Sequence, residues 1–429
     1  MSPLTVSKPV GRSERMAALD VLRGVALCGI LLVHIHAMGQ SWIRDWPPFP
    51  PSLWKPDWQI YLINQVFLEG AMRGLFTLLF GAGLLLMTAR DHSPEAPIQV
   101  ADIYLRRSIG LMGFGILNAV VLLYPGDILF FYGVCGLILF TFRHVKSRFL
   151  VAISMGLLVA VTAPQALLAW RDAHHVHQGD VALAAQERRA IVTPDQQHAI
   201  EARQTTLDTY NPRPDQLARE TKARRGGWLT ATLWSIESWS GGAFGLPGAV
   251  MISQSLAYMM LGMVLLRSNV LNGMQSSRFY FSLAAGGYLL GMAMRGLRLW
   301  LLWRADFSPL VWQPTLIYEL ARLPLTLGHM GLILALWRLH RDGWVSKIFA
   351  ALGQMALTNY LGQTLLTSLV FYGLSLYDGF NAYGLWLISL GIWVMQAMFS
   401  LWWLNRYRFG PVEWMLRSIA YGVRQPMRR

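Results

Sequence analysis

The chain has few charged residues and almost no cysteine. Asp, Glu, Lys and Arg together make up 14% of its 429 residues, whereas an average soluble protein carries about 25%. So little charge cannot cover a soluble surface when 54% of the residues are hydrophobic. The two cysteines, Cys28 and Cys135, lie inside apolar runs, where a thiol behaves as a small hydrophobic group. A disulfide framework and a Cys-x-x-Cys metal site are therefore excluded.

The charge that is present is mainly positive, with a formal net charge of +14. Its Lys and Arg residues form short clusters between apolar runs and do not line one aromatic-studded face, so no nucleic-acid partner is expected. Basic clusters beside apolar runs are topology signals next to anionic lipid. The expected partners are therefore membrane lipids.

Ten apolar runs approach the length of a membrane-spanning helix, which needs about 20 residues. The predicted fold class is therefore an all-α polytopic membrane protein with about ten transmembrane helices. The runs are 17–39, 62–89, 103–124, 126–143, 148–170, 243–266, 279–302, 313–338, 347–373 and 382–404.

A polar segment divides these runs into two sets of five. We expect an N-terminal membrane half (1–170), an extracytoplasmic insert of two or so short helices (171–226) and a C-terminal membrane half (227–429). If ten helices alternate, Lys and Arg gather in the loops on one side, which includes both ends of the chain. Basic residues resist translocation, so we expect both termini in the cytoplasm. The polar start, with Arg12 and Arg15, leads into a long run without a clear cleavage site, which predicts an uncleaved first helix.

The first apolar run contains the densest group of polar residues. Each ionisable group in a spanning helix costs about 2.5 to 3.5 kcal/mol and is therefore a functional candidate. Asp20 and Arg23 share a helix face, so either a local ion pair or a ligand-binding role for Arg23 explains them. His34 follows Asp20 by about 21 Å of helix, toward the outer half of the bilayer. A neutral imidazole there suits a general base.

Asp127 lies in the hairpin between the third and fourth runs, at a depth similar to that of His34. A carboxylate in contact with the imidazole would orient it and stabilise its charged form. We therefore predict His34 as the catalytic base and Asp127 as its orienting partner.

Several other runs contain ionisable groups. Glu69 and Arg73 are four residues apart in the second run and able to pair. Buried arginines that outnumber nearby acids indicate an anionic ligand such as a phosphate or carboxylate, although salt bridges between helices explain them equally well. No metal or haem is expected. The residues in later runs are Arg295, Arg298, Glu319, Arg322 and His329.

Three sequence blocks resemble the YeiB-like bacterial membrane proteins, whose C-terminal half is known as domain of unknown function 418. The first block is Leu19-Asp20-x-Leu22-Arg23-Gly24. The second joins Arg73-x-Leu75-Phe76 through Phe80-Gly81-x-Gly83 to Gly126-Asp127-Ile128-Leu129. The third is Gly353-Gln354-Met355-Ala356-Leu357-Thr358-Asn359-Tyr360-Leu361, closed by Phe409-Gly410-Pro411-Val412-Glu413-Trp414 and Arg417.

The spacing of Asp20, Arg23 and His34 is also similar to the first-helix motif of the membrane acyltransferase-3 family, in which Asp-x-x-Arg precedes a functionally required His. A broader similarity to the lysosomal heparan-glucosaminide acetyltransferase group points the same way. The resemblance implies a multi-pass protein of the bacterial cytoplasmic (inner) membrane that moves an acyl group, such as acetyl, from cytoplasmic acyl-CoA to an extracytoplasmic hydroxyl or amine. One departure is Asn118, which stands where relatives often carry a His.

The remaining predicted site residues bind the donor and the acceptor. The acyl-CoA donor is expected at Arg23, Arg73, Arg106 and Arg107, and the acceptor, which is a carbohydrate, a lipid or a small molecule, at Asn359, Tyr360, Gln363 and Glu69. An exporter of small organic anions is the main alternative, because two sets of five helices suit alternating access, although the halves show no sequence match. A structural or sensory protein is a third alternative, and a homodimer is left open.

Overall fold

The part of the chain that the structure describes is helical. The structure is a computed structural model, and within the residues it describes there is no β-strand, which confirms the all-α fold class. Arg12 and Arg15 lie outside the described residues. The structure describes residues 17–41, 52, 54–88, 96–188, 193–210, 214–308 and 310–429.

The helices follow one another with short connections. In chain order they are α1 (Ala17–Gly39), α2 (Pro56–Ile63), the π-helix η2 (Asn64–Leu68), α3 (Ala71–Thr88), α4 (Ala96–Val120), α5 (Leu129–Leu139), the 3-10 helix η3 (Phe140–Phe142), α6 (Ser147–Glu187), α7 (Pro194–Tyr210), α8 (Pro214–Arg225), α9 (Trp228–Ala243), α10 (Leu246–Arg267), α11 (Ser277–Arg304), α12 (Gln313–Leu339), α13 (Trp344–Gln354), α14 (Ala356–Ser368), the π-helix η4 (Leu369–Gly373), α15 (Ala382–Arg406) and α16 (Pro411–Tyr421).

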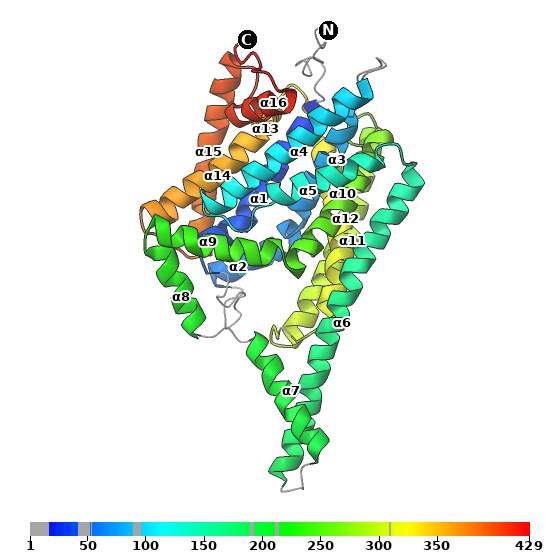
Figure 1. Cartoon of the computed structure of the whole chain (residues 1–429). Coiled ribbons are helices and arrows are strands. Elements are labelled where there is room, and N and C mark those ends of the chain that lie inside the picture. The colour runs from blue at the N-terminus through cyan, green and yellow to red at the C-terminus, as the bar shows by residue number, and fades with distance from the viewer. Residues whose placement is uncertain are drawn as a thin grey trace.

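Six of the described helical segments are long and apolar enough to cross a membrane, namely α1, the α2–α3 segment, α6, α10, α12 and α15. The other predicted runs also contain helices, but α5 is shorter, and α4, α11 and the α13–α14 pair are more polar or more interrupted. The start of α1 and helix α16 lie at the same end of the bundle (Figure 1). A helical membrane protein follows from these features, while the total of about ten spans and the sidedness of the termini stay predictions.

Helix α6 continues well beyond residue 170, where the predicted insert begins. Its 41 residues correspond to about 60 Å of helix. The helix can continue past residue 170 because no proline interrupts residues 171–187. The second half projects away from the bundle with α7 packed along it, and α8 then returns beside α9 (Figure 1). The polar insert therefore consists of an extension of α6 followed by two separate helices.

Arg224 fastens this insert to the bundle. The side chain is 1% exposed and pairs with Glu220 at 3.0 Å. It also donates to the Tyr377 hydroxyl at 2.9 Å, to the Tyr372 hydroxyl and, at 3.0 Å, to the carbonyl oxygen of Met38. Because the last carbonyls of a helix lack partners within the helix, Arg224 caps the C-terminus of α1.

Two glycines allow α1 and α13 to cross in close contact. A Cβ atom on Gly24 would lie 2.0 Å from the carbonyl oxygen of Phe349, and one on Gly353 would lie 1.8 Å from that of Asp20. Only residues without a side chain fit at such a crossing. The crossing holds the Asp20–Arg23 turn of α1 against the start of the α13–α14 segment.

The second predicted run is broken in its interior. The π-helix η2 ends before Glu69, Gly70 adopts a positive φ of 70°, and α3 starts at Ala71. Glu69 and Arg73, which the sequence places at a spacing able to pair, lie on opposite sides of this break, and Arg73 donates to Gln254 Oε1 at 3.3 Å.

Basic side chains from two other helices close the end of η2. The carbonyl oxygen of Phe67 lies 2.6 Å from His329 Nε2, that of Glu69 accepts from Arg295 at 2.7 Å, and that of Gly70 accepts from Arg322 at 3.0 Å. Carbonyl groups away from water require such partners. Part of the basic content of α11 and α12 is therefore explained as helix capping.

Candidate functional site

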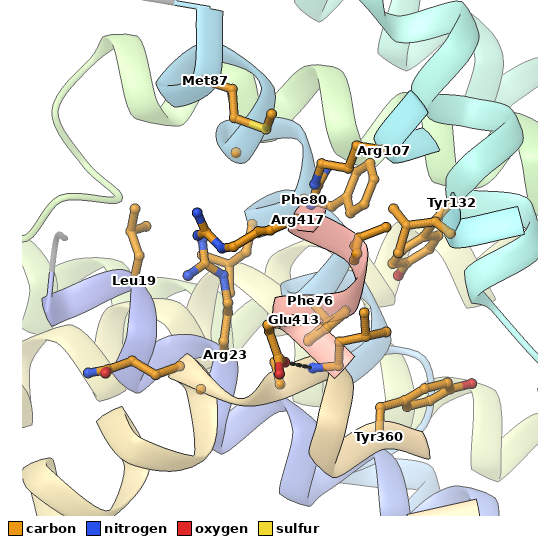
Figure 2. Close-up of a pocket in the computed structure, with 18 of the residues that line it drawn as sticks. Leu19, Arg23, Phe76, Phe80, Met87, Arg107, Tyr132, Tyr360, Glu413 and Arg417 are labelled. Atoms are coloured by element: carbon orange, nitrogen blue, oxygen red, sulfur yellow. Dashed lines mark hydrogen bonds between the residues drawn. The ribbon is translucent and has the colours of Figure 1, made fainter. Parts of the chain in front are cut away.

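A cavity of about 290 Å³ lies between α1, α3, α4, α5, the α13–α14 segment and α16. Its wall is mainly apolar, and Figure 2 shows charged side chains gathered near Arg23 and Arg417. The lining residues that matter below are Asp20, Arg23, Phe76, Phe80, Arg107, Leu111, Tyr132, Tyr360, Glu413 and Arg417.

Three arginines from separate helices meet at this cavity. Arg23 comes from α1, Arg107 from α4 and Arg417 from α16. The side chains of Arg23 and Arg417 lie next to each other, and Arg107 stacks on Phe80 with 5.1 Å between the guanidinium carbon and the ring centroid (Figure 2). Arg23 also forms an ion pair with Asp20 at 2.8 Å. Clustered guanidinium groups beside apolar walls suit a ligand that is anionic at one end.

Two tyrosines link the cavity to neighbouring elements. The Tyr132 hydroxyl is hydrogen-bonded to Thr77 at 2.5 Å. The Tyr360 hydroxyl donates to Asp127 Oδ1 at 3.4 Å and lies 3.4 Å from the backbone nitrogen of Ile128. Tyr360 therefore connects the cavity wall to the loop between α4 and α5.

Asp127 fixes that loop through several hydrogen bonds. Its carboxylate is 1% exposed and accepts from Asn118 Nδ2 and from the backbone N–H of Phe130, each at 2.9 Å. The second bond satisfies a donor in the first turn of α5, as helix-capping carboxylates do. Asp127 thus has a structural role that the sequence pattern did not show.

The predicted contact between His34 and Asp127 is not formed. The ring of Tyr124 lies beside His34, with 5.6 Å between ring centroids, while Asp127 is held by Asn118, Phe130 and Tyr360. His34 Nδ1 is buried without a hydrogen-bond partner, and His34 does not line the cavity. The carboxylate cannot orient the imidazole in this arrangement because its acceptor positions are directed elsewhere.

The four predicted donor-binding arginines separate in the structure. Arg23 and Arg107 line the cavity, whereas Arg73 lies deeper and contacts Gln254. Arg106 pairs with Asp102 at 2.9 Å, and its side chain is 48% exposed. Consecutive residues on a helix point about 100° apart, so Arg106 and Arg107 cannot both face the cavity.

Only one of the four predicted acceptor residues lines the cavity, and it is Tyr360. Asn359 donates to Leu352 O and Ser400 Oγ, both at 3.1 Å, and Gln363 donates to Gln396 at 3.3 Å. These bonds hold α14 against α13 and α15. Glu69 lies at the break after η2 and accepts from Tyr318 at 3.4 Å.

Glu413 joins α16 to the start of α14. Its carboxylate accepts from the backbone N–H groups of Leu357 at 2.6 Å and Thr358 at 3.0 Å, and from the Thr358 hydroxyl at 2.5 Å. Burial raises the pKa of this carboxyl, and the bonds from Thr358 and Leu357 lower it in part. Gly410 makes the contact possible, because a Cβ atom there would lie 2.1 Å from Glu413 Oε2. The motif from Phe409 to Trp414 therefore fixes α16 against the start of α14. This contact places Arg417, on the same helix, at the cavity.

The fold and the cavity together define a helical membrane protein with a cavity lined by three arginines. Residues 265–423 match the family model described as protein of unknown function (DUF418). The chain is 28% identical to uncharacterized protein YeiB of Escherichia coli (strain K12) over 432 residues, which cover 96% of this chain and 98% of the relative. It is 26% identical to uncharacterized protein YxaH of Bacillus subtilis (strain 168) over 441 residues, 98% of each chain.

These matches, which in the relatives extend over nearly the full chain, support a relationship of the chain to the YeiB-like DUF418 proteins. The bacterial relatives support a bacterial origin for it. No solved structure matches the chain with significance.

Proposed function

We propose that this protein is a membrane acyltransferase that uses cytoplasmic acyl-CoA as donor and modifies an extracytoplasmic acceptor at the bacterial inner membrane. The observation that supports the proposal is the cavity, where Arg23, Arg107 and Arg417 meet beside apolar side chains. An acyl-CoA has matching polarity, with phosphates at one end and an acyl chain at the other. Arginine forks bind phosphate, and Phe76 and Phe80 offer apolar surface for the chain.

The size of the cavity suggests how the donor enters. Ligand pockets commonly measure about 300 to 1,000 Å³, so a cavity of about 290 Å³ is too small for the whole coenzyme. The pantetheine arm and the acyl group enter the cavity, and the nucleotide phosphates stay on the arginine side. Tyr360 then lies close to the path of the thioester.

The reaction proceeds by direct transfer in this proposal. The acceptor hydroxyl or amine loses a proton to His34, its oxygen or nitrogen attacks the thioester carbonyl, and the carbon–sulfur bond breaks. The released thiolate takes up a proton to give free coenzyme A. Because His34 lies outside the cavity and beside Tyr124, the acceptor approaches from the side opposite the donor. Asp127 acts as a positioning residue that fixes the loop between the two.

The proposal is tested by binding measurements on the purified full-length protein. We expect acetyl-CoA and longer acyl-CoAs to raise the melting temperature more than free coenzyme A or ATP does. Arg107→Gln should weaken acyl-CoA binding at least tenfold, since it removes a cavity cation. Arg106→Gln is the matched control, because it changes the same charge on the adjacent residue, which faces away from the cavity.

Two results would contradict this assignment. If no thioester binds, transport of small organic anions becomes the better hypothesis. If Arg106→Gln and Arg107→Gln weaken binding equally, the effect is general electrostatics and not recognition in the cavity. A His34→Ala variant that binds acyl-CoA but does not transfer the acyl group would support the role of His34 as base.

A further inference from the structure

The break between η2 and α3 gathers more positive than negative charge. The break is far along the chain from α16, and its arginines lie outside the acyl-CoA cavity. Four guanidinium groups and two carboxylates surround it, an excess of two positive charges. They are Arg73, Arg295, Arg298, Arg322, Glu69 and Glu319.

Arg322 has protein partners for its charge and its donors. It pairs with Glu319 at 2.9 Å and donates to the carbonyl oxygen of Gly70 at 3.0 Å and to Gln254 at 3.3 Å. Its guanidinium also lies over the ring of Tyr258, 4.5 Å from the centroid. The role of Arg322 is therefore explained by the fold.

Arg295 and Arg298 differ from Arg322 because they keep unused donors. Arg295 is fully buried and donates through Nη2 to Glu69 O, but its Nε and Nη1 are buried without a hydrogen-bond partner. Arg298 donates through Nη1 to Gln65 at 2.7 Å, and its Nε is also buried without a partner. Both guanidinium groups lie against the Tyr318 ring, 4.9 and 5.6 Å from its centroid. Two neighbouring cations with unused donors thus lie against one ring.

Such an arrangement is unfavourable without a further partner. Buried donors are nearly always hydrogen-bonded, and uncompensated charge away from water is strongly destabilising. An anion removes both problems at once. Arg298, Tyr318 and Glu69 are only half-buried, so the group lies near the surface of the protein.

We propose that a halide-sized anion, with chloride as the probe, binds between Arg295 and Arg298 beside Tyr318. The ion accepts from the free Nε–H groups and offsets part of the positive excess. It stabilises the packing of α11 against the break and is separate from the donor-binding site.

The test uses purified full-length protein and replaces potassium gluconate with potassium chloride at constant ionic strength. We expect the melting temperature to rise with chloride and then saturate. Arg298→Gln should raise the half-saturating chloride concentration at least tenfold. Arg304→Gln, which changes an exposed arginine on the same helix, should keep the wild-type response.

A second measurement keeps the test decisive if a variant unfolds too early to compare melting curves. The ³⁵Cl NMR line of dilute chloride should be broadened by wild-type protein and by Arg304→Gln, and the broadening should be lost with Arg298→Gln. Equal responses to chloride and gluconate, or an unchanged chloride response in Arg298→Gln, would overturn the proposal. Acyl-CoA binding by Arg298→Gln should equal that of wild type, so this site can fail without the acyltransferase proposal failing.

Discussion

Replacing Arg224 with methionine should release helix α8 from the bundle while leaving the membrane helices folded. Arg224 belongs to α8 of the insert and pairs with Glu220 of the same helix. Its guanidinium group also binds the end of α1 through the Met38 carbonyl group and the segment after α14 through Tyr372 and Tyr377. A methionine fills a similar volume but can make none of these bonds. The remaining polar contacts of α8 with the bundle would then include those of Glu220 with Ser41 and Tyr377 and those of Arg225 with the carbonyl oxygen of Tyr377.

The size of the effect follows from the burial of the pair. Removing one partner of a buried ion pair costs about 3 to 5 kcal/mol, because the other charge remains buried. Glu220 is 2% exposed, but it would keep hydrogen bonds from Ser41 and, at 3.2 Å, from Tyr377. We therefore expect a loss near the lower end, about 3 kcal/mol. Adding Glu220→Gln to the variant should restore part of the stability, since no unpaired charge remains.

Limited proteolysis at residues 211–227 measures release of α8, and thermal unfolding measures the global effect. The matched control is Arg219→Met on the same helix, where the ion pair with Asp215 is exposed and contributes little. Equal protease sensitivity for Arg219→Met and Arg224→Met would refute the reasoning. So would a double variant with Glu220→Gln that is less stable than Arg224→Met alone.

Two further variants test the packing around the cavity. Gly353→Val should abolish folding or sharply lower the yield of monodisperse protein, because any Cβ atom there collides with the backbone of α1. The control variant Gly286→Val should be tolerated, because the space at that position is open. Glu413→Ala should lower stability by about 1 to 2 kcal/mol, because the cap on α14 is lost. Thermal unfolding measures this loss against the exposed control Glu237→Ala. A stable Gly353→Val protein, or equal stability of the two glutamate variants, would contradict these readings.

Helices with uninterrupted apolar runs could be predicted from the sequence. Helix α1 has the predicted limits of 17–39, and α12 and α15 end within two residues of the predicted 338 and 404. The reason is that hydrophobic length is a local property of the chain. The break at Gly70 could not be predicted in this way, because the run 62–89 is apolar on both sides of it. The break is held by side chains from α11 and α12.

The residues of the cavity could also be predicted only in part, because their positions depend on contacts between helices. Arg23 and Tyr360 were expected at a ligand site, and both line the cavity. The sequence could not distinguish Arg106 from Arg107, because the direction of a side chain depends on how α4 is rotated against its neighbours. Arg417 lies almost 400 residues from Arg23 in the chain, and the packing of α16 against α4 and α14 brings the two together.

The arginines that contribute to the net charge of +14 have different physical roles. Arg224 and Arg322 direct most of their donors to protein groups, so their replacement should lower stability at every ligand concentration. Arg107 faces a cavity, and Arg298 retains a buried donor without a partner, so their replacement should change ligand response more than intrinsic stability. Hydrogen-bond saturation therefore separates structural from ligand-binding arginines where charge and burial alone do not. The unpartnered donors of Arg295 and Arg298 mark the proposed anion site in this way, whereas Arg107 is distinguished by its place in the cavity wall.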